Sequence, residues 1–164
     1  MLLLIAVKIL STVLLTQPVV LEQEPVTIAL VECGNSALLG HIADLARDPG
    51  RSVALRLRNI KAEGSPSISW EVYAGPQRPS FSSEGPFFVG IFSGFGVTEL
   101  TEFLFPLDRA ILATGDRALH VTFLPVSGLA ENGPREKAAA REILTIGEIS
   151  LVLDEATQSP PPPK

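Results

Sequence analysis

The chain has 164 residues, of which 46% are hydrophobic and 19% are charged, and its formal net charge is −5. A chain of this length and composition forms one folded domain with a sizeable core, so a disordered protein is excluded. A net negative charge offers no basic surface to phosphate groups, and nucleic acid is therefore not an expected partner. The single cysteine, Cys33, excludes an internal disulfide and a cysteine-based metal site.

Residues 1–20 are strongly apolar, and three interpretations of them stay open. Lys8 divides the apolar run and no Ala-x-Ala sequence follows it, which counts against a secretory signal. Lys8 and the polar residues after it also weaken a membrane span, which needs about twenty apolar residues with few charges. We favour an extra strand of the domain or a junction to an upstream segment. Export or membrane contact is expected only if residues 1–20 act as a signal or anchor.

Two short β-type runs come next, at residues 18–21 and 26–31, and Glu22–Pro25 separates them as a turn. Residues 37–46 have apolar side chains at helical spacing. This spacing indicates either a short helix that Ser36 caps or a loop.

Residues 52–60 form the clearest expected strand. Apolar side chains such as Leu55 and Leu57 share one face, while Arg56 and Arg58 share the other. The two arginines are suited either to binding an anion or to pairing with acids on a neighbouring strand. We favour cross-strand ion pairs, which are the common arrangement for charged residues on the outer face of a sheet.

An aromatic hairpin follows. Its first strand, residues 68–73, alternates so that Trp70 and Tyr73 lie on opposite faces and cannot form one flat binding platform. The polar loop after this strand contains one large apolar residue, Phe81. The second strand, residues 87–92, is apolar on both faces, which is typical of a strand buried between layers.

The remaining part of the chain repeats short apolar alternation. Residues 98–105 predict an edge strand, residues 109–113 predict a turn of helix, and residues 118–124 and 144–153 predict two further strands. Residues 135–142 contain helix formers without an apolar face, which indicates a surface turn of helix or a flexible excursion.

Seven or eight short strands with turns about every ten residues indicate an all-β fold. We expect an antiparallel β-sandwich, jelly-roll-like, with one or two short helices. The sandwich domain is placed at residues 21–155, between the apolar segment 1–20 and a proline-rich flexible tail at 156–164.

The sequence shows no catalytic equipment. The two histidines, His41 and His120, are far apart, and their spacing does not support a metal site. No Gly-x-Ser-x-Gly nucleophile sequence occurs, and the paired carboxylates are typical of a solvated surface. We therefore expect no catalytic residue, no metal and no cofactor, and a binding, covering or structural role instead.

The order of motifs resembles the C-terminal β-domain of the tyrosinase and polyphenol oxidase family, which are type-3 copper proteins. In that family a strand of the Lys-Phe-Asp-Val-Tyr type is followed by a glycine-containing aromatic strand and a Phe-Asp-Val-Thr-like segment with a short helix. A Val-Thr-Leu/Phe-Val-Pro strand and a closing Val-Thr-Ile-Gly-x-Ile/Val strand come next. The counterparts here are residues 69–73 (SWEVY), 85–92 (GPFFVGIF), 105–108 (FPLD), 120–125 (HVTFLP) and 144–149 (LTIGEI).

The resemblance implies a function through a partner. The family's copper ligands lie on a separate helical domain that this chain lacks, so the chain is not expected to be an enzyme itself. It implies a lid, shielding or maturation domain whose partner is a type-3 copper catalytic domain, in cis or in trans. The alternative is a structural or assembly subunit, or a binding module, on the same sandwich.

The lid hypothesis needs a side chain that can enter the partner's active site. Phe81, on the loop of residues 74–85, is the candidate plug, with Gln77 and Arg78 as further residues of the interaction loop. The competing interpretation is that Phe81 folds back onto the sheet.

Overall fold

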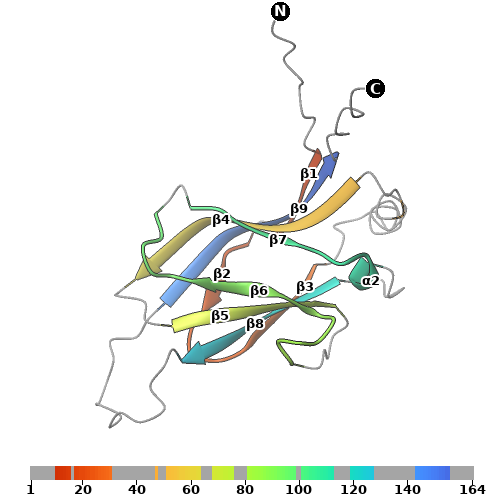
Figure 1. The fold of residues 1–164 in the computed structure, drawn as a ribbon. Coiled ribbons are helices and arrows are strands. Elements are labelled where there is room, and N and C mark those ends of the chain that lie inside the picture. Colours follow the sequence, from red (N-terminus) through yellow and green to blue (C-terminus); the bar gives the residue numbers. More distant parts are fainter. Residues whose placement is uncertain are drawn as a thin grey trace, which may run out of the picture.

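The protein is described here from a computed structural model (Figure 1). The structure describes residues 10–15, 17–30, 47, 51–63, 68–75, 81–98, 101–112, 119–127 and 143–155. Their strands and helix are β1 (Leu10–Leu15), β2 (Val19–Leu21), β3 (Val26–Leu30), β4 (Arg51–Glu63), β5 (Ile68–Gly75), β6 (Phe88–Ser93), β7 (Phe103–Pro106), α2 (Arg109–Leu112), β8 (Leu119–Ser127) and β9 (Ile143–Glu155).

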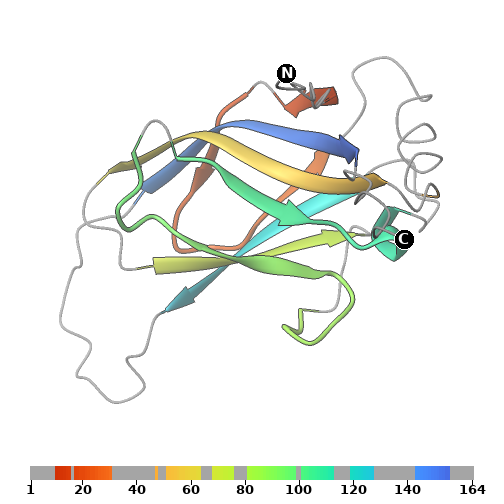
Figure 2. The ribbon, with the colours of Figure 1, turned by 45° about the horizontal axis from the view of Figure 1, so that its top comes forward.

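The strands form two antiparallel sheets that face each other as two layers (Figures 1 and 2). Sheet A has the order β1-β9-β4-β7, with β2 also paired to β9, and sheet B has the order β3-β8-β5-β6. The expected antiparallel β-sandwich is therefore confirmed.

The strand order is that of a jelly roll. β2 pairs with β9, β3 with β8, β4 with β7 and β5 with β6, as if one long antiparallel hairpin had been rolled up. Rolling the hairpin adds the pairs β4–β9 and β5–β8 at the middle of each sheet. Consecutive strands consequently cross between the layers at every step from β2 onward except β5 to β6.

The apolar N-terminal segment contributes to sheet A where the structure describes it. β1 pairs with β9 from Leu10 opposite Leu153 to Leu15 opposite Ile149, and β2 continues along the same edge. The possible helices at 37–46 and 135–142, and the tail at 156–164, lie outside the described residues. No helix in the described ranges has the length and apolar character needed to cross a membrane.

Side chains from the two inner faces form one core. Trp70 of β5 is fully buried and stacks on Phe92 of β6, with the ring centroids 5.7 Å apart. Phe92 also meets Phe103 and Phe105 of the opposite sheet, at 5.1 and 6.2 Å. The alternation in the sequence produces this arrangement because every second side chain of a strand points to the same layer. The largest fully buried residues include Trp70, Phe123, Leu21, Leu30, Leu55, Leu57, Ile60, Leu144, Ile146 and Ile149.

One expectation about β6 is wrong. The sequence predicts that residues 87–92 are buried on both faces, but Ile91 is 54% exposed while Phe92 is 3% exposed. The described residues form two layers, and none of their strands covers the outer face of β6. β7 is also shorter than the expected strand at 98–105, and it begins at Phe103.

Sheet A contains a matched irregularity at Asn59 and Gly147. The buried positions of β4 shift from Leu57 to Ile60, three residues on instead of two, and Asn59 between them has a left-handed φ of 53°. Gly147 lies against Asn59, where a Cβ would be 3.0 Å from the Cβ of Asn59. Because residue 147 has no side chain, β4 and β9 can both shift at this point the set of residues that faces the core. The β4–β9 pairing therefore continues on either side of Asn59 and Gly147.

Candidate functional site

The outer face of sheet B is the candidate site. Residues directly opposite each other in the ladders share a face, so Glu71 lies between Ile91 of β6 and Leu124 of β8, and Tyr73 lies between Phe88 and Thr122. We call this surface the sheet B face. It consists of Glu71 and Tyr73 with the surrounding side chains of Phe81, Phe88, Ile91 and Leu124.

Tyr73 anchors the sheet B face. It belongs to the outer side of β5, yet only 1% of it is exposed, because Phe81 and Phe88 cover it. Its ring meets theirs edge-on, with centroids 5.3 and 5.6 Å away. The Tyr73 hydroxyl donates a hydrogen bond of 2.7 Å to Oε2 of Glu71. Burial, and then the hydrogen bond and charge of Glu71, raise the pKa of Tyr73 to about 12.

Phe81, the predicted plug, lies on this face. Its ring packs edge-on against Tyr73, as the competing interpretation expects, but 51% of Phe81 is exposed. Phe81 therefore both covers Tyr73 and offers half of its surface to another molecule. Gln77 and Arg78, the other predicted residues of the loop, lie outside the described residues.

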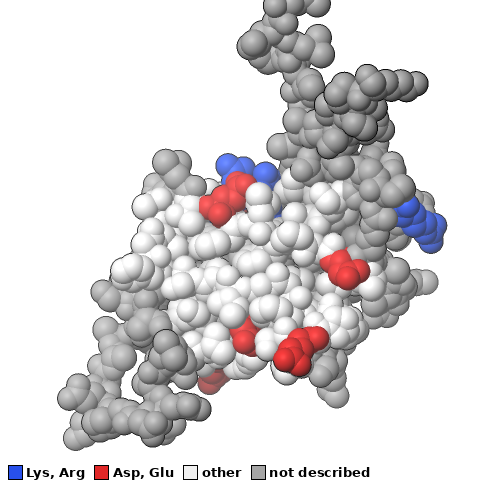
Figure 3. All heavy atoms as spheres, in the orientation of Figure 1, with Lys and Arg blue, Asp and Glu red and all other residues white. Residues whose placement is uncertain are grey.

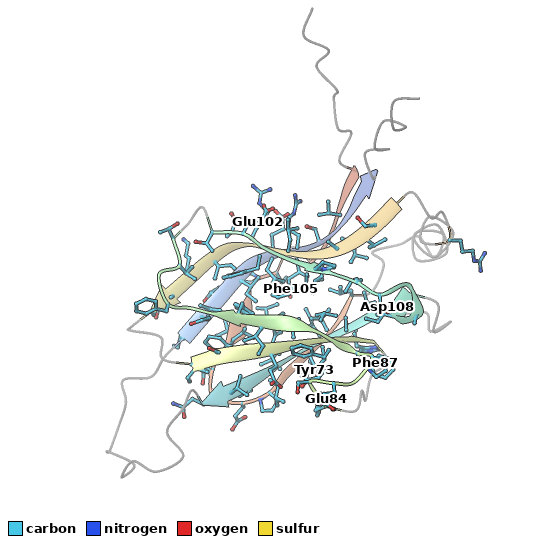
Figure 4. The ribbon with its side chains drawn as sticks, in the orientation of Figure 1. Tyr73, Glu84, Phe87, Glu102, Phe105 and Asp108 are labelled. Atoms are coloured by element: carbon cyan, nitrogen blue, oxygen red, sulfur yellow. The ribbon has the colours of Figure 1, made fainter. Side chains whose placement is uncertain are left out.

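Apolar side chains flank the one charged residue in the strands of sheet B, and the exposed Glu84 lies on the adjacent loop beside Tyr73 (Figure 4). Glu71 is the one Asp, Glu, Lys or Arg in the sequence of β3, β5, β6 and β8. Ile91 is 54% exposed, and Phe88 and Leu124 are half-buried. An exposed apolar group of this kind, around a single charge, is typical of a surface that contacts another protein.

The outer face of sheet A has a different character. Arg56 donates from Nε to Oγ of the buried Ser150, 3.1 Å away, and its guanidinium lies 3.5 Å from Glu148 on β9. Arg58 pairs with Glu102 at 3.3 Å. The expected ion pairs with neighbouring acids are confirmed. These charges neutralise one another within the chain, and Figure 4 shows Glu102 on the outer side of sheet A, with Phe105 between the layers.

Phe95 is an exposed residue that the sequence analysis did not single out. It is 84% exposed in the turn after β6, where its backbone N–H donates to Oγ of Ser93, 3.1 Å away. Gly96 then takes a φ of 70°, which completes the turn. An aromatic residue between two glycines, Gly94 and Gly96, was the signal available in the sequence.

Figure 3 shows the side of the molecule where β6 and β7 lie. Its described surface is largely uncharged, with acidic groups near one another toward the lower edge of the view. Within the described ranges, no three or more His, Cys, Asp or Glu residues lie together as a metal site would require. His120 is half-buried on the outer side of β8, and its Nδ1 has no hydrogen-bond partner there. His41 lies outside the residues that the structure describes.

Comparison with known proteins gave matches among solved structures only. No family model matches the chain, and no curated protein matches it. A recombinantly expressed latent aurone synthase, a polyphenol oxidase, matches with a TM-score of 0.50 and 16% identity, over 86% of this chain and 26% of that chain. The same latent enzyme co-crystallised with hexatungstotellurate(VI) matches with a TM-score of 0.50 and 15% identity, over 85% and 26% of the two chains. The likeness is one of fold, and this chain spans about a quarter of the oxidase's length.

Proposed function

We propose that this chain is a non-catalytic domain that covers the active site of a type-3 copper phenol oxidase, in the same polypeptide or on a separate chain. The observation that carries the proposal is the likeness of fold to a quarter of a polyphenol oxidase, over 86% of this chain. The motif order from residue 69 to residue 149 supports it independently, because it was recognised from the sequence alone. That oxidase is described as latent, which is the state that a covering domain would maintain.

The residues of the chain fit a covering role better than a chemical one. A lid must exclude water and leave no unpaired charge against its partner. The strands of sheet B contain one Asp, Glu, Lys or Arg, which is Glu71, and Glu84 lies on the loop beside Tyr73 (Figure 4). A lid that blocks the active site also needs a side chain that projects from it.

Two phenylalanines are candidates for that side chain. Phe81 is 51% exposed and Phe95 is 84% exposed. Phe81 precedes β6 and Phe95 follows it, so they lie toward opposite ends of that strand (Figure 1). One small active-site opening can therefore admit one of them. We retain Phe81 as the proposed plug, because it lies on the sheet B face, and treat Phe95 as its rival.

The test is to purify the chain and the copper-loaded oxidase domain encoded upstream of it or beside it. Adding the chain is expected to form a complex and to suppress phenol oxidation, and removing it by proteolysis is expected to restore the rate. If the oxidase neither binds the chain nor changes its rate when the chain is added, the proposal is wrong.

Two variants then separate the candidate plugs. Phe81→Ala is expected to raise the oxidation rate of the assembled complex, and Phe95→Ala is expected to leave that rate suppressed. The opposite result assigns the plug to Phe95. Measuring the rate at a saturating concentration of the chain keeps a loss of affinity from being mistaken for an opened active site.

A further inference from the structure

We propose that the sheet B face, centred on Glu71, Phe81 and Ile91, is the surface that docks on the oxidase domain, and that this domain places an arginine or lysine opposite Glu71. This inference rests on the proposed function and adds to it which side of the sandwich faces the partner and what chemistry the partner must offer.

The first argument is the contrast between the two outer faces. On the sheet B face, Ile91 and Phe81 expose about half of their surfaces beside the half-buried Phe88 and Leu124. Covering this surface releases water from apolar groups, which stabilises a complex. Sheet A also exposes Val20 and Leu104, by 47% and 53%, so the contrast lies in its charges. The guanidinium of Arg56 is already bound to Ser150 and Glu148, so docking there would desolvate charges that have no need of a partner.

The second argument is the charge of Glu71. Its Oε2 accepts a hydrogen bond from the hydroxyl of Tyr73. Both cross-strand neighbours of Glu71 on this face, Ile91 and Leu124, are apolar. An apolar partner that covered this carboxylate would bury a charge with one hydrogen bond, which is costly unless a cation accompanies it. The docked partner must therefore present a basic side chain at this point.

The same charge argues against a second copy of this chain as the occupant. A symmetric dimer through the centre of the sheet B face would bring two Glu71 carboxylates close together, and neither copy offers a lysine or arginine in the strands of sheet B. Like charges that are desolvated together oppose association. The partner is consequently a different surface, apolar with one cation, and the oxidase domain of the proposed function is the candidate.

The chain supplies a matched pair of variants for the test. Ile91 lies on the edge strand β6 of sheet B and is 54% exposed, while Leu104 lies on the edge strand β7 of sheet A and is 53% exposed. Ile91→Asp and Leu104→Asp make the same chemical change on opposite outer faces. Both residues are half in solvent, so each variant is expected to fold, and circular dichroism and the fluorescence of the buried Trp70 check this.

The affinity of each variant for the copper-loaded oxidase domain is measured by calorimetry, with the full chain throughout. Ile91→Asp is expected to weaken binding at least about tenfold, and Leu104→Asp to change it less than about twofold. Glu71→Gln, which keeps an acceptor for Tyr73, is expected to weaken binding about tenfold and to reduce its salt dependence.

Each result has a distinct meaning. If wild type binds and Leu104→Asp is the variant that loses affinity, the docking face is wrong while the proposed function stands. Unchanged affinity in Glu71→Gln overturns the predicted cation. If wild type shows no binding, the proposed function fails and this inference fails with it. A dimer of the chain alone that Ile91→Asp dissociates assigns the face to self-association and overturns the inference.

Discussion

At Gly90 the backbone of sheet B lies directly against a side chain of sheet A. It lies on β6 of sheet B, and a Cβ added there would be 2.6 Å from Cδ1 and 2.8 Å from Cε1 of Phe105, on β7 of sheet A. Carbon atoms in good contact are about 3.5–4.0 Å apart, so the added methyl group would overlap the ring. Phe105 is 6% exposed and packs against both Phe92 and Phe103, with ring centroids 6.2 and 6.4 Å away, so its ring has little room to move aside.

Gly90→Ala is therefore expected to destabilise the protein through two separate effects. The overlap with Phe105 costs about 1–3 kcal/mol, as overpacking in a core does. Gly90 also has a φ of 158°, which a residue with a side chain rarely adopts, and this adds a cost of about 1–2 kcal/mol. The sum corresponds to a fall in melting temperature of roughly 5–15 °C for a chain of this size.

Two controls separate these effects. Gly96 has a φ of 70° and nothing within 4 Å of an added Cβ, so Gly96→Ala measures the cost of a positive φ without any overlap, although in the left-handed region rather than at the φ of Gly90. Phe105→Leu replaces the rigid ring with a smaller, rotatable side chain. In that background Gly90→Ala is expected to cost at least about 1 kcal/mol less than in wild type, because the overlap is relieved.

Denaturant unfolding followed by fluorescence gives the free energies. Trp70 is the single tryptophan, and it is fully buried against Phe92, so its emission reports on the core. The reasoning is refuted if Gly90→Ala costs the same with leucine at position 105 as with phenylalanine. It is also refuted if Gly90→Ala is no more destabilising than Gly96→Ala.

Three further predictions concern Tyr73, Gly147 and the pair of acids Glu148 and Glu102. The pKa of Tyr73 is raised from 10.0 to about 12, so the stability that Tyr73 contributes is complete below pH 10 and is lost as the pH rises to 12. Across this interval the free energy of unfolding is expected to fall more steeply for wild type than for Tyr73→Phe. Gly147→Ala is expected to cost about 1–3 kcal/mol in denaturant unfolding, because its Cβ would be 3.2 Å from the backbone oxygen of Asn59, and a neutral result would contradict the matched irregularity in sheet A. Glu148→Gln is expected to cost about 1–2 kcal/mol, since its side chain is 22% exposed beside a half-buried arginine. Glu102→Gln, whose ion pair is more exposed, is expected to cost less than about 1 kcal/mol, and equal losses would show that burial does not set the difference.

Part of the candidate site is predictable from the sequence. Alternation along β5 correctly placed Trp70 and Tyr73 on opposite faces, because that placement depends only on the period of a strand. Phe81 was identified as the large apolar residue in a polar loop. Its contact with Tyr73 was not predictable, since the loop has no period that would indicate where its side chains point.

Other features of the site were missed for the same reason. The sequence of β6 is apolar on both faces, and it does not say which face has a layer over it, so the exposure of Ile91 was not foreseen. Phe95 was overlooked because its exposure depends on the turn that Gly96 allows and on the absence of neighbours there.

The sequence by itself determined most of the strands, the inward-facing residues of the strands that alternate, and the sandwich class, because local alternation and turn residues specify these features over a few positions. The tertiary structure decided the rest. It set the jelly-roll order of the strands, the change of phase at Asn59 and Gly147, and the insertion of Phe105 against Gly90. It also left the apolar face around Glu71 without a covering layer among the described residues. These features depend on which distant segments meet, and burial is a property of the assembled layers rather than of any one strand.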